Sequence, residues 1–258
     1  MAADGGPLKT SEDAVLGGRL LLRQPLKGHR VGHDAILLAA ATGACAGEYA
    51  VDLGAGVGGA GLALATRVAG LKVTLVEIDA TLARLAQENA QRNGMADRVR
   101  AVARDAEDLD ALAAAGLGPG SADRVLMNPP FHDARRHNVS PDPGRRLAYA
   151  GAPGLLKRWI AAAAFLLKPG GAVTLIWRAD DLSAALEALA DDFGAIAVLP
   201  VVPRANAAPI RVLLRAVKGG AAAPVHFPAL VLNDAHGKPT EAAEAVLRGA
   251  EPLSLAGL

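Results

Sequence analysis

The sequence has few aromatic residues, a single cysteine and almost no net charge. Aromatic residues make up 3% of its 258 residues although 52% are hydrophobic, so we expect one sizeable and mainly aliphatic core. One cysteine, Cys45, excludes an internal disulfide and suits a reducing compartment, and we expect its side chain to be buried. A net charge of +1 gives no global field, so a nucleic acid would have to meet local basic patches.

Long hydrophobic runs and targeting signals are also missing. The apolar run 35–46 is too short to span a bilayer and contains Thr42 and Gly43. Residues 1–12 carry acidic side chains and no apolar stretch, which predicts a flexible N-terminus rather than a signal peptide. The sequence therefore predicts a soluble, cytoplasmic protein with no membrane contact.

Short apolar runs alternate with segments of helical periodicity, which is typical of parallel strands joined by crossover helices. The pattern predicts a seven-stranded, mostly parallel α/β sheet with helices on both faces, the last two strands forming a hairpin-like pair. We expect one domain over 13–258, with an N-terminal extension (13–47) packed on it and a weakly patterned tail (219–258). The strands are expected at 49–53, 71–77, 99–103, 124–127, 172–177, 195–202 and 210–217, and the helices at 61–68, 81–92, 155–167 and 182–190.

A glycine-rich turn follows the first predicted strand of the sheet. Gly54, Gly56 and Gly59 satisfy G-x-G-x-x-G, a spacing that lets the backbone approach a nucleotide and is compatible with a nicotinamide dehydrogenase. Asp52 lies two residues before the first glycine, where its carboxylate could accept hydrogen bonds from an ammonium group. Glu77 ends the second strand, where it could accept both hydroxyls of a ribose.

Each of these acidic residues also has a structural interpretation. Asp52 could cap the helix that follows it, and Glu77 could be a solvated strand end. For Asp79 we favour the structural role, as the N-cap of the helix that starts at Ala80.

A rigid corner follows the fourth predicted strand. Asn128, Pro129, Pro130 and Phe131 form a run in which two prolines remove two backbone donors and fix φ twice. The corner combines an amide side chain, exposed carbonyls and an aromatic face, which suits it to hold a planar amino group. Phe131 could instead be core packing, but the polar segment that follows favours exposure.

Taken together, these motifs resemble those of the class I S-adenosylmethionine (AdoMet) methyltransferases. The 52–59 turn resembles their first motif, 76–79 their second, 104–106 the acidic motif that meets the adenine of the cofactor, and 128–131 the fourth motif of the branch that methylates amino groups. The resemblance implies a Rossmann-like fold and AdoMet as cofactor. The cofactor-binding residues it implies are Asp34, Asp52, Gly54, Ala55, Gly56, Glu77, Ile78, Asp105, Ala106 and Asn128.

A narrower resemblance points to the tRNA1(Val) adenine-37 N6-methyltransferase family. It spans most of 16–218, and the chain departs from the family pattern at 31–33, which leaves open whether His33 or Asp34 contacts the cofactor. The resemblance implies methyl transfer to N6 of an adenine in RNA, in a tRNA anticodon loop. The segments that carry it are 24–31, 34–39, 128–133, 140–145, 203–206 and 211–215.

The corner has a direct chemical use in such a reaction. The side-chain oxygen of Asn128 and the carbonyl of Pro129 would accept the two N6 hydrogens, while Phe131 stacks on the base with ~1–3 kcal/mol. Pro130 keeps the corner rigid. No metal is required because the methylsulfonium carries the driving force, and His29 and His33 have no further ligands nearby in sequence.

Two groups of basic residues accompany the motifs. One follows the corner within the segment 131–151, and the other lies in the extension. Such runs are often solvated faces, but both flank the same predicted strand-end surface, which favours contact with RNA phosphates. The candidate RNA-binding residues are Lys27, Arg30, Arg135, Arg136, Arg145 and Arg146.

Five other functions remain open on the sequence. The same corner could hold a protein glutamine amide, although an aromatic hydroxyl is more usual there than Phe131. A guanine N2 or a DNA adenine methyltransferase is a nearer variant. A nicotinamide-dependent oxidoreductase fits the glycine spacing, and a catalytically silent module could bind the cofactor and dock RNA.

Overall fold

The structure is a computed structural model that describes residues 8–28, 30–130 and 154–258. All seven predicted strands are present, and each begins and ends within a few residues of its expected bounds, except that the fifth starts five residues earlier. In chain order the elements are β1 (Thr10–Val15), β2 (Leu20–Pro25), α1 (His33–Ala41), β3 (Tyr49–Leu53), α2 (Gly59–Arg67), β4 (Lys72–Glu77), α3 (Ala80–Arg92), β5 (Val99–Ala103), α4 (Leu109–Ala114), β6 (Ala122–Met127), α6 (Leu155–Leu166), β7 (Leu167–Arg178), α7 (Leu182–Leu189), β8 (Phe193–Arg204), β9 (Arg211–Lys218), β10 (Val225–His226), β11 (Leu230–Asn233) and α8 (Glu241–Leu247).

The main sheet has nine strands in the order β10-β8-β9-β7-β6-β3-β4-β5, with β11 also paired to β8. Strands β5, β4, β3, β6 and β7 are parallel, and β9 is antiparallel to both of its neighbours. Strand β3 lies between β4 and β6, so the chain leaves it in one direction and later returns on its other side. In an open α/β sheet, such a switch opens a crevice at the carboxyl ends of the strands.

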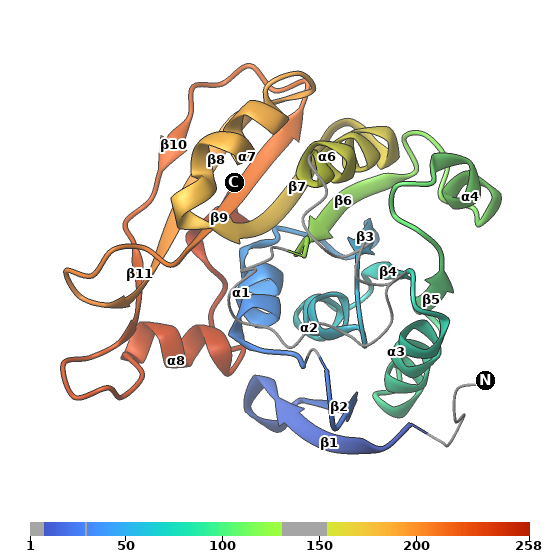
Figure 1. The fold of residues 1–258 in the computed structure, drawn as a ribbon, viewed down its shortest axis with the longest axis horizontal. Helices are drawn as coiled ribbons and strands as arrows, with labels where there is room; N and C mark the ends of the chain where they lie inside the picture. Colours follow the sequence, from blue (N-terminus) through green and yellow to red (C-terminus); the bar gives the residue numbers. More distant parts are fainter. Residues whose placement is uncertain (1–7, 29, 131–153) are drawn as a thin grey trace, which may run out of the picture.

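Helices cover both faces of this sheet (Figure 1). Helices α1, α2 and α3 lie on one face, and α4, α6 and α7 on the other. Residues alternate between the two cores along each strand: in β6, Leu126 packs on one side while Val125 and Met127 pack on the other. Both cores are mainly aliphatic, as expected, and Trp159 and Trp177 are buried in them.

The N-terminal extension contains a β-hairpin that the sequence did not predict. Strands β1 and β2 pair antiparallel and lie beside α2 and α3, outside the main sheet (Figure 1). Because β1 begins at Thr10, the segment 10–12 is ordered, whereas we expected the whole of 1–12 to be flexible. The expectation failed because β1 reads T-S-E-D-A-V, and its ladder bonds to β2 do not require an apolar face.

The tail extends the sheet rather than forming a separate appendage. Strands β10 and β11 pair parallel with β8, which raises the number of strands from the expected seven to nine. Helix α8 then packs against α1 and β11. These strands are two and four residues long, so they leave little periodicity in the sequence.

Cys45 is exposed, and the expectation that it is buried was wrong. It follows α1 in the turn that leads to β3, and its backbone amide donates to Glu48 Oε2 at 2.8 Å. The residue precedes the amino end of β3 and belongs to neither core. In the described part of the chain, no helix has the length and apolar character needed to cross a bilayer.

Candidate functional site

The glycine turn joins β3 to α2 at the carboxyl edge of the sheet. Gly54 and Gly56 have φ values of 71° and 57°, which side chains with a Cβ rarely adopt. The amide of Ala55 donates to the carbonyl of Val76 at 2.9 Å, and the amide of Gly58 donates back to Ala55 at 2.8 Å. These bonds fix the turn across the end of β4.

Gly54 and Gly56, two of the three positive-φ glycines of this turn, face different surroundings. A Cβ at Gly54 would lie 2.4 Å from Cη2 of Trp159, so this glycine allows the indole of α6 to pack under the turn. A Cβ at Gly56 would meet no heavy atom of the described residues within 4 Å. The turn is therefore filled by protein on one side and open on the other.

Glu77 ends β4 and braces the turn. Its side chain is buried, its Oε2 accepts from the amide of Gly56 at 2.8 Å, and its Oε1 accepts from the amide of Asp79 at 2.9 Å. Each carboxylate oxygen has a second acceptor site. Glu77 is therefore not a solvated strand end, and its expected contact with ribose hydroxyls stays a prediction.

Asp52 lies beneath the turn with 2% of its surface exposed. Its Oδ2 accepts from the amide of Gly61 in the first turn of α2 at 2.7 Å, so the capping interpretation applies at least to this oxygen. Burial raises the pKa of Asp52 to about 7, the bond from Gly61 lowers it, and the charge of Glu77 raises it further. The protein thus holds an ionisable carboxyl whose charge is costly until a cation compensates it.

The next two strand ends provide the remaining predicted cofactor residues. Ile78 is an apolar side chain left 51% exposed beside Glu77. Asp105 follows β5 and is exposed, with Oδ1 accepting from the amide of Glu107 at 2.9 Å, whereas Ala106 is buried. Asp79 caps α3 by accepting from the amides of Thr81 and Leu82, as predicted.

Asn128 follows the last residue of β6 at the same edge. It is half-buried, and no donor in the described part of the chain forms a hydrogen bond with its buried Oδ1. Pro129 and Pro130 continue the chain. Because buried polar atoms normally have a partner, this oxygen marks a place where a ligand donor is expected. Phe131, Arg135, Arg136, Arg145 and Arg146 lie outside the described residues.

The extension reaches the site through α1 and the segment before it. Asp34, in the first turn of α1, accepts from Nε of Arg211 at 2.9 Å, an ion pair that sequence reasoning missed. Val31 packs against Gly59 at the start of α2, where a Cβ would come within 2.6 Å of its Cγ2. Of the predicted basic residues here, Lys27 is exposed, and the guanidinium of Arg30 pairs with Asp13.

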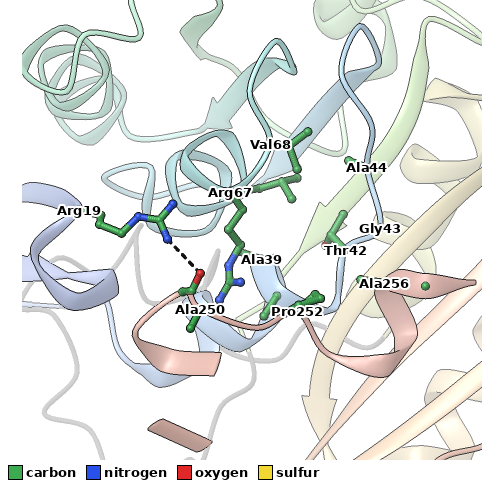
Figure 2. Close-up of a pocket in the computed structure, with 14 residues that line it drawn as sticks. Arg19, Ala39, Thr42, Gly43, Ala44, Arg67, Val68, Ala250, Pro252 and Ala256 are labelled. Atoms are coloured by element: carbon green, nitrogen blue, oxygen red, sulfur yellow. Dashed lines mark hydrogen bonds between the residues drawn. The ribbon is translucent and has the colours of Figure 1, made fainter. Parts of the chain in front are cut away.

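A hollow of about 350 Å³ lies at the other end of α2, away from this edge (Figure 2). Arg67, the last residue of α2, donates to the carbonyls of Val246 and Glu251, and Arg19 donates to that of Gly249. These arginines bind the end of α8 and the chain after it to the core. The lining of the hollow contains none of the predicted site residues.

Residues 32–202 match the family model of the methyltransferase small domain. The chain belongs to this family. Membership makes AdoMet the cofactor of this methyltransferase domain and excludes the nicotinamide alternative. That the carboxyl edge of the sheet holds the cofactor stays a prediction.

Several curated proteins are similar to this methyltransferase domain. A release factor glutamine methyltransferase of Chlorobaculum tepidum is 29% identical over 58% of this chain and 52% of its own length. A tRNA1(Val) (adenine(37)-N6)-methyltransferase of Glaesserella parasuis is 27% identical over 58% of this chain and 60% of its own, and one of Shewanella amazonensis is 32% identical over 50% and 52%. The chain thus matches little more than half the length of these relatives.

Solved structures repeat the fold. A predicted O-methyltransferase, Atu636 of Agrobacterium tumefaciens, superposes with a TM-score of 0.72 over 85% of this chain and 98% of its own, at 25% identity. The 16S rRNA N2 G1207 methyltransferase of Thermus thermophilus, in complex with AdoMet and guanosine, gives a TM-score of 0.57 over 84% and 52% at 22% identity. The second similarity concerns the fold alone.

The residues at the carboxyl edge fit AdoMet. Gly56 leaves open the space that a Cβ would fill. Ile78, which follows the neighbouring strand β4, offers an exposed apolar surface. Asp52 is a buried carboxyl that a cation would stabilise, which suits the ammonium group of the cofactor. Asn128, at the same edge, has an acceptor without a donor among the described residues, which leaves it available for a second ligand beside the cofactor.

Proposed function

We propose that this domain transfers the methyl group of AdoMet to the exocyclic N6 of an adenine in RNA, in a tRNA anticodon loop. The observation that carries the proposal is the buried Oδ1 of Asn128, which has no hydrogen-bond donor among the described residues. A buried acceptor left without a donor costs roughly 1–3 kcal/mol, so the site favours a substrate that supplies an N–H.

An amino group suits this corner better than a hydroxyl or a ring carbon. An amino group has two N–H bonds, and the corner offers two acceptors, Oδ1 of Asn128 and the carbonyl of Pro129. Proline fixes φ at positions 129 and 130, so the carbonyl direction is held without help from the substrate. Two acceptors that hold both hydrogens favour a tetrahedral nitrogen and aim its lone pair.

Bound AdoMet supplies an activated methyl group on a sulfonium. The chain contributes orientation, which is a large source of rate in such displacements. In this proposal Asp52, Glu77, Ile78, Asp105 and the 54–56 turn hold the cofactor, and Asn128 and Pro129 hold the target amino group. Asp34 belongs to the cofactor set only if its pair with Arg211 leaves an oxygen available.

The choice of RNA adenine draws on the relatives and on the segment after the corner. Three of the similar curated proteins are named tRNA1(Val) (adenine(37)-N6)-methyltransferases. Phe131 offers a face for stacking an unpaired base, and an anticodon loop presents bases that need little unstacking. Four arginines between positions 135 and 146 could contact phosphates.

Glutamine methylation in a protein is the second candidate. The similarity to a release factor glutamine methyltransferase favours it, and a glutamine amide also presents two N–H bonds to the corner. The arginines at 135, 136, 145 and 146 favour RNA, because a polyanion gains from each cation it meets.

Labelled AdoMet, incubated in separate reactions with total RNA and with total protein, tests the proposal. Nucleoside mass spectrometry should find N6-methyladenosine in the RNA, with no labelled glutamine in the protein. The Asn128→Ala protein serves as the control. Label in methylglutamine or in N2-methylguanosine would overturn the adenine assignment, and label in neither fraction would overturn both substrates.

A further inference from the structure

Asn89 lies in α3 with its side chain fully buried between the N-terminal hairpin and the glycine turn. Its Nδ2 donates to the carbonyl of Arg23 and to that of Val57, both at 3.0 Å. Its Oδ1 accepts from the amide of Arg23 at 2.8 Å. One amide side chain therefore joins β2, α3 and the turn that faces the cofactor.

Asn93, one helical turn further on, joins α3 to β2 but not to the glycine turn. Its Oδ1 accepts from the amide of Leu21 at 3.0 Å, and its Nδ2 donates to the carbonyl of Leu21 at 2.8 Å. Leu21 and Arg23 are two residues apart in β2, so their backbone N–H and C=O groups point to the same edge of the strand. The two asparagine side chains bond to these groups as a neighbouring strand would. Asn93 shares this docking role with Asn89, but no hydrogen bond links its side chain to the glycine turn among the described residues.

The additional bond, from Asn89 to the carbonyl of Val57, lies in a part of the turn where glycines on both sides leave the backbone flexible. Val57 lies between Gly56 and Gly58, which have φ values of 57° and 90°. Glycine has more accessible backbone conformations than any other residue, so a turn of this kind needs outside contacts to keep one geometry. The carbonyl of Val57 is bound by Asn89, while the amide of Gly56 is bound by Glu77.

We propose that Asn89 is a positioning residue for AdoMet: it fixes the Val57 carbonyl and so holds the glycine turn in its binding geometry before the cofactor arrives. Preorganisation of this kind raises affinity because binding no longer has to order the turn. The hairpin, which is far from the motifs in sequence, becomes part of the support of the cofactor site. The proposal rests on the cofactor of the family and is independent of the methylated target.

A matched pair of variants separates positioning from simple docking. Asn89→Ala and Asn93→Ala each remove one amide that docks β2, so thermal unfolding should show a lower Tm for both. Calorimetric titration with AdoMet should show about tenfold or weaker binding for Asn89→Ala and little change for Asn93→Ala, because only the first removes the bond to the turn. Equal weakening in both, or none in Asn89→Ala, would overturn the proposal.

Hydrogen exchange on the cofactor-free proteins gives a second measurement that needs no catalysis. The amides of Gly56 and Gly58 should be protected in the wild-type protein and in Asn93→Ala, and should exchange faster in Asn89→Ala. Unprotected amides in the wild-type protein would mean that the turn is not held in advance. If Asn89→Ala does not fold, Asn89→Asp keeps the acceptor for Arg23 and lacks the donors, and the same two comparisons apply.

Discussion

Asn128 and Asp52 are the two side chains at the carboxyl edge whose surroundings in the cofactor-free protein leave an interaction incomplete. Asn128 has a buried oxygen with no donor among the described residues, and Asp52 has a buried carboxyl whose charge is destabilised. Each makes a different prediction, because one faces the expected target and the other the expected cofactor.

Asn128→Ala should abolish most methyl transfer while AdoMet binding persists. The amide oxygen is needed for the target amino group, and removal of one preorganised polar group of this kind typically lowers turnover by roughly a hundredfold or more. Single-turnover rates with saturating RNA, together with AdoMet titration, measure the two effects. Normal turnover in the variant would remove the corner from the mechanism.

The pKa of Asp52 predicts a pH dependence of AdoMet affinity. Since the carboxyl has a pKa of about 7, its charged form increases from about pH 6 to pH 8, and binding of the ammonium should tighten over that range. Asn at this position can still accept from Gly61 but cannot ionise. We therefore expect Asp52→Asn to bind more weakly, with an affinity that no longer rises with pH.

The same group also affects folding, and the sign follows from its raised pKa. The folded protein binds the proton more tightly than the unfolded chain, whose Asp titrates near pH ~4. The stabilising contribution is full below about pH 4 and is lost as the pH rises through about 7. The Tm of Asp52→Asn relative to wild type should therefore increase from pH 5 to pH 8; a constant difference would contradict the pKa shift.

The turn between β3 and α2 makes a prediction that separates stability from binding. In Gly54→Ala the new Cβ would overlap Trp159, and overpacking typically costs about 1–3 kcal/mol in addition to the strain of a positive φ. In Gly56→Ala the Cβ would enter open space on the side expected to hold AdoMet. We expect a larger fall in Tm for Gly54→Ala and, among proteins that fold, a larger decrease in AdoMet affinity for Gly56→Ala.

Calorimetry and thermal unfolding of both glycine variants check this contrast. Both share a left-handed backbone, so their common strain cancels in the comparison. The opposite ranking would mean that the cofactor approaches the turn from the side of α6.

Seven strands of the main sheet were predictable because each contains a short apolar run between turn signals, whereas β10 and β11, of two and four residues, were not. The end of β3 and the cap at Asp79 were located to the residue, since a glycine turn and an N-cap are local in sequence. Strand β1 could not be predicted in this way, because it contains three consecutive polar residues after Thr10 and has only one strand as neighbour. Its counterpart β2 is held by Asn89 and Asn93, which are distant in sequence.

Single residues show the same distinction between local and distant causes. The buried position of Asn89 has a weak sequence signal, since it lies on the apolar stripe that also holds Leu85 and Ala86. The hydrogen bond from Asn89 to the carbonyl of Val57 has no sequence signal, because the two residues are far apart in the chain. Cys45 was misplaced because residue type favours burial, whereas the turn after α1 decides its exposure.

At the scale of the whole molecule, the two ends of α2 have different tasks. Its first residues adjoin the glycine turn and Val31, whereas Arg67 at its other end donates to carbonyls of the tail. The tail adds strands beside β8 and a helix beside α1. Basic residues at the C-terminal end of α2 and near α8 provide a natural control for RNA binding.

We expect RNA binding to depend on the arginines that follow the corner and not on those near α8. Replacing Arg145 and Arg146 with glutamine should weaken RNA binding and reduce the magnitude of its salt slope by roughly 0.7–0.9 for each phosphate that is no longer neutralised. AdoMet affinity should persist, because the binding of the cofactor is assigned to other residues. Affinity measured across a series of salt concentrations gives both quantities.

Arg248→Gln is a control that removes one positive charge outside the proposed RNA-binding face, to be compared with the effect per charge of replacing Arg145 and Arg146. Arg248 is exposed at the end of α8, where it pairs only weakly with Glu244 through solvent-accessible side chains. It lies near the hairpin residue Gly17, on the side of the molecule that holds the hollow of Figure 2. Its replacement should leave the RNA affinity and the salt slope unchanged. If Arg248→Gln weakens binding as much per charge as the replacement of Arg145 and Arg146, the RNA responds to overall charge, and the proposed face at the carboxyl edge is wrong.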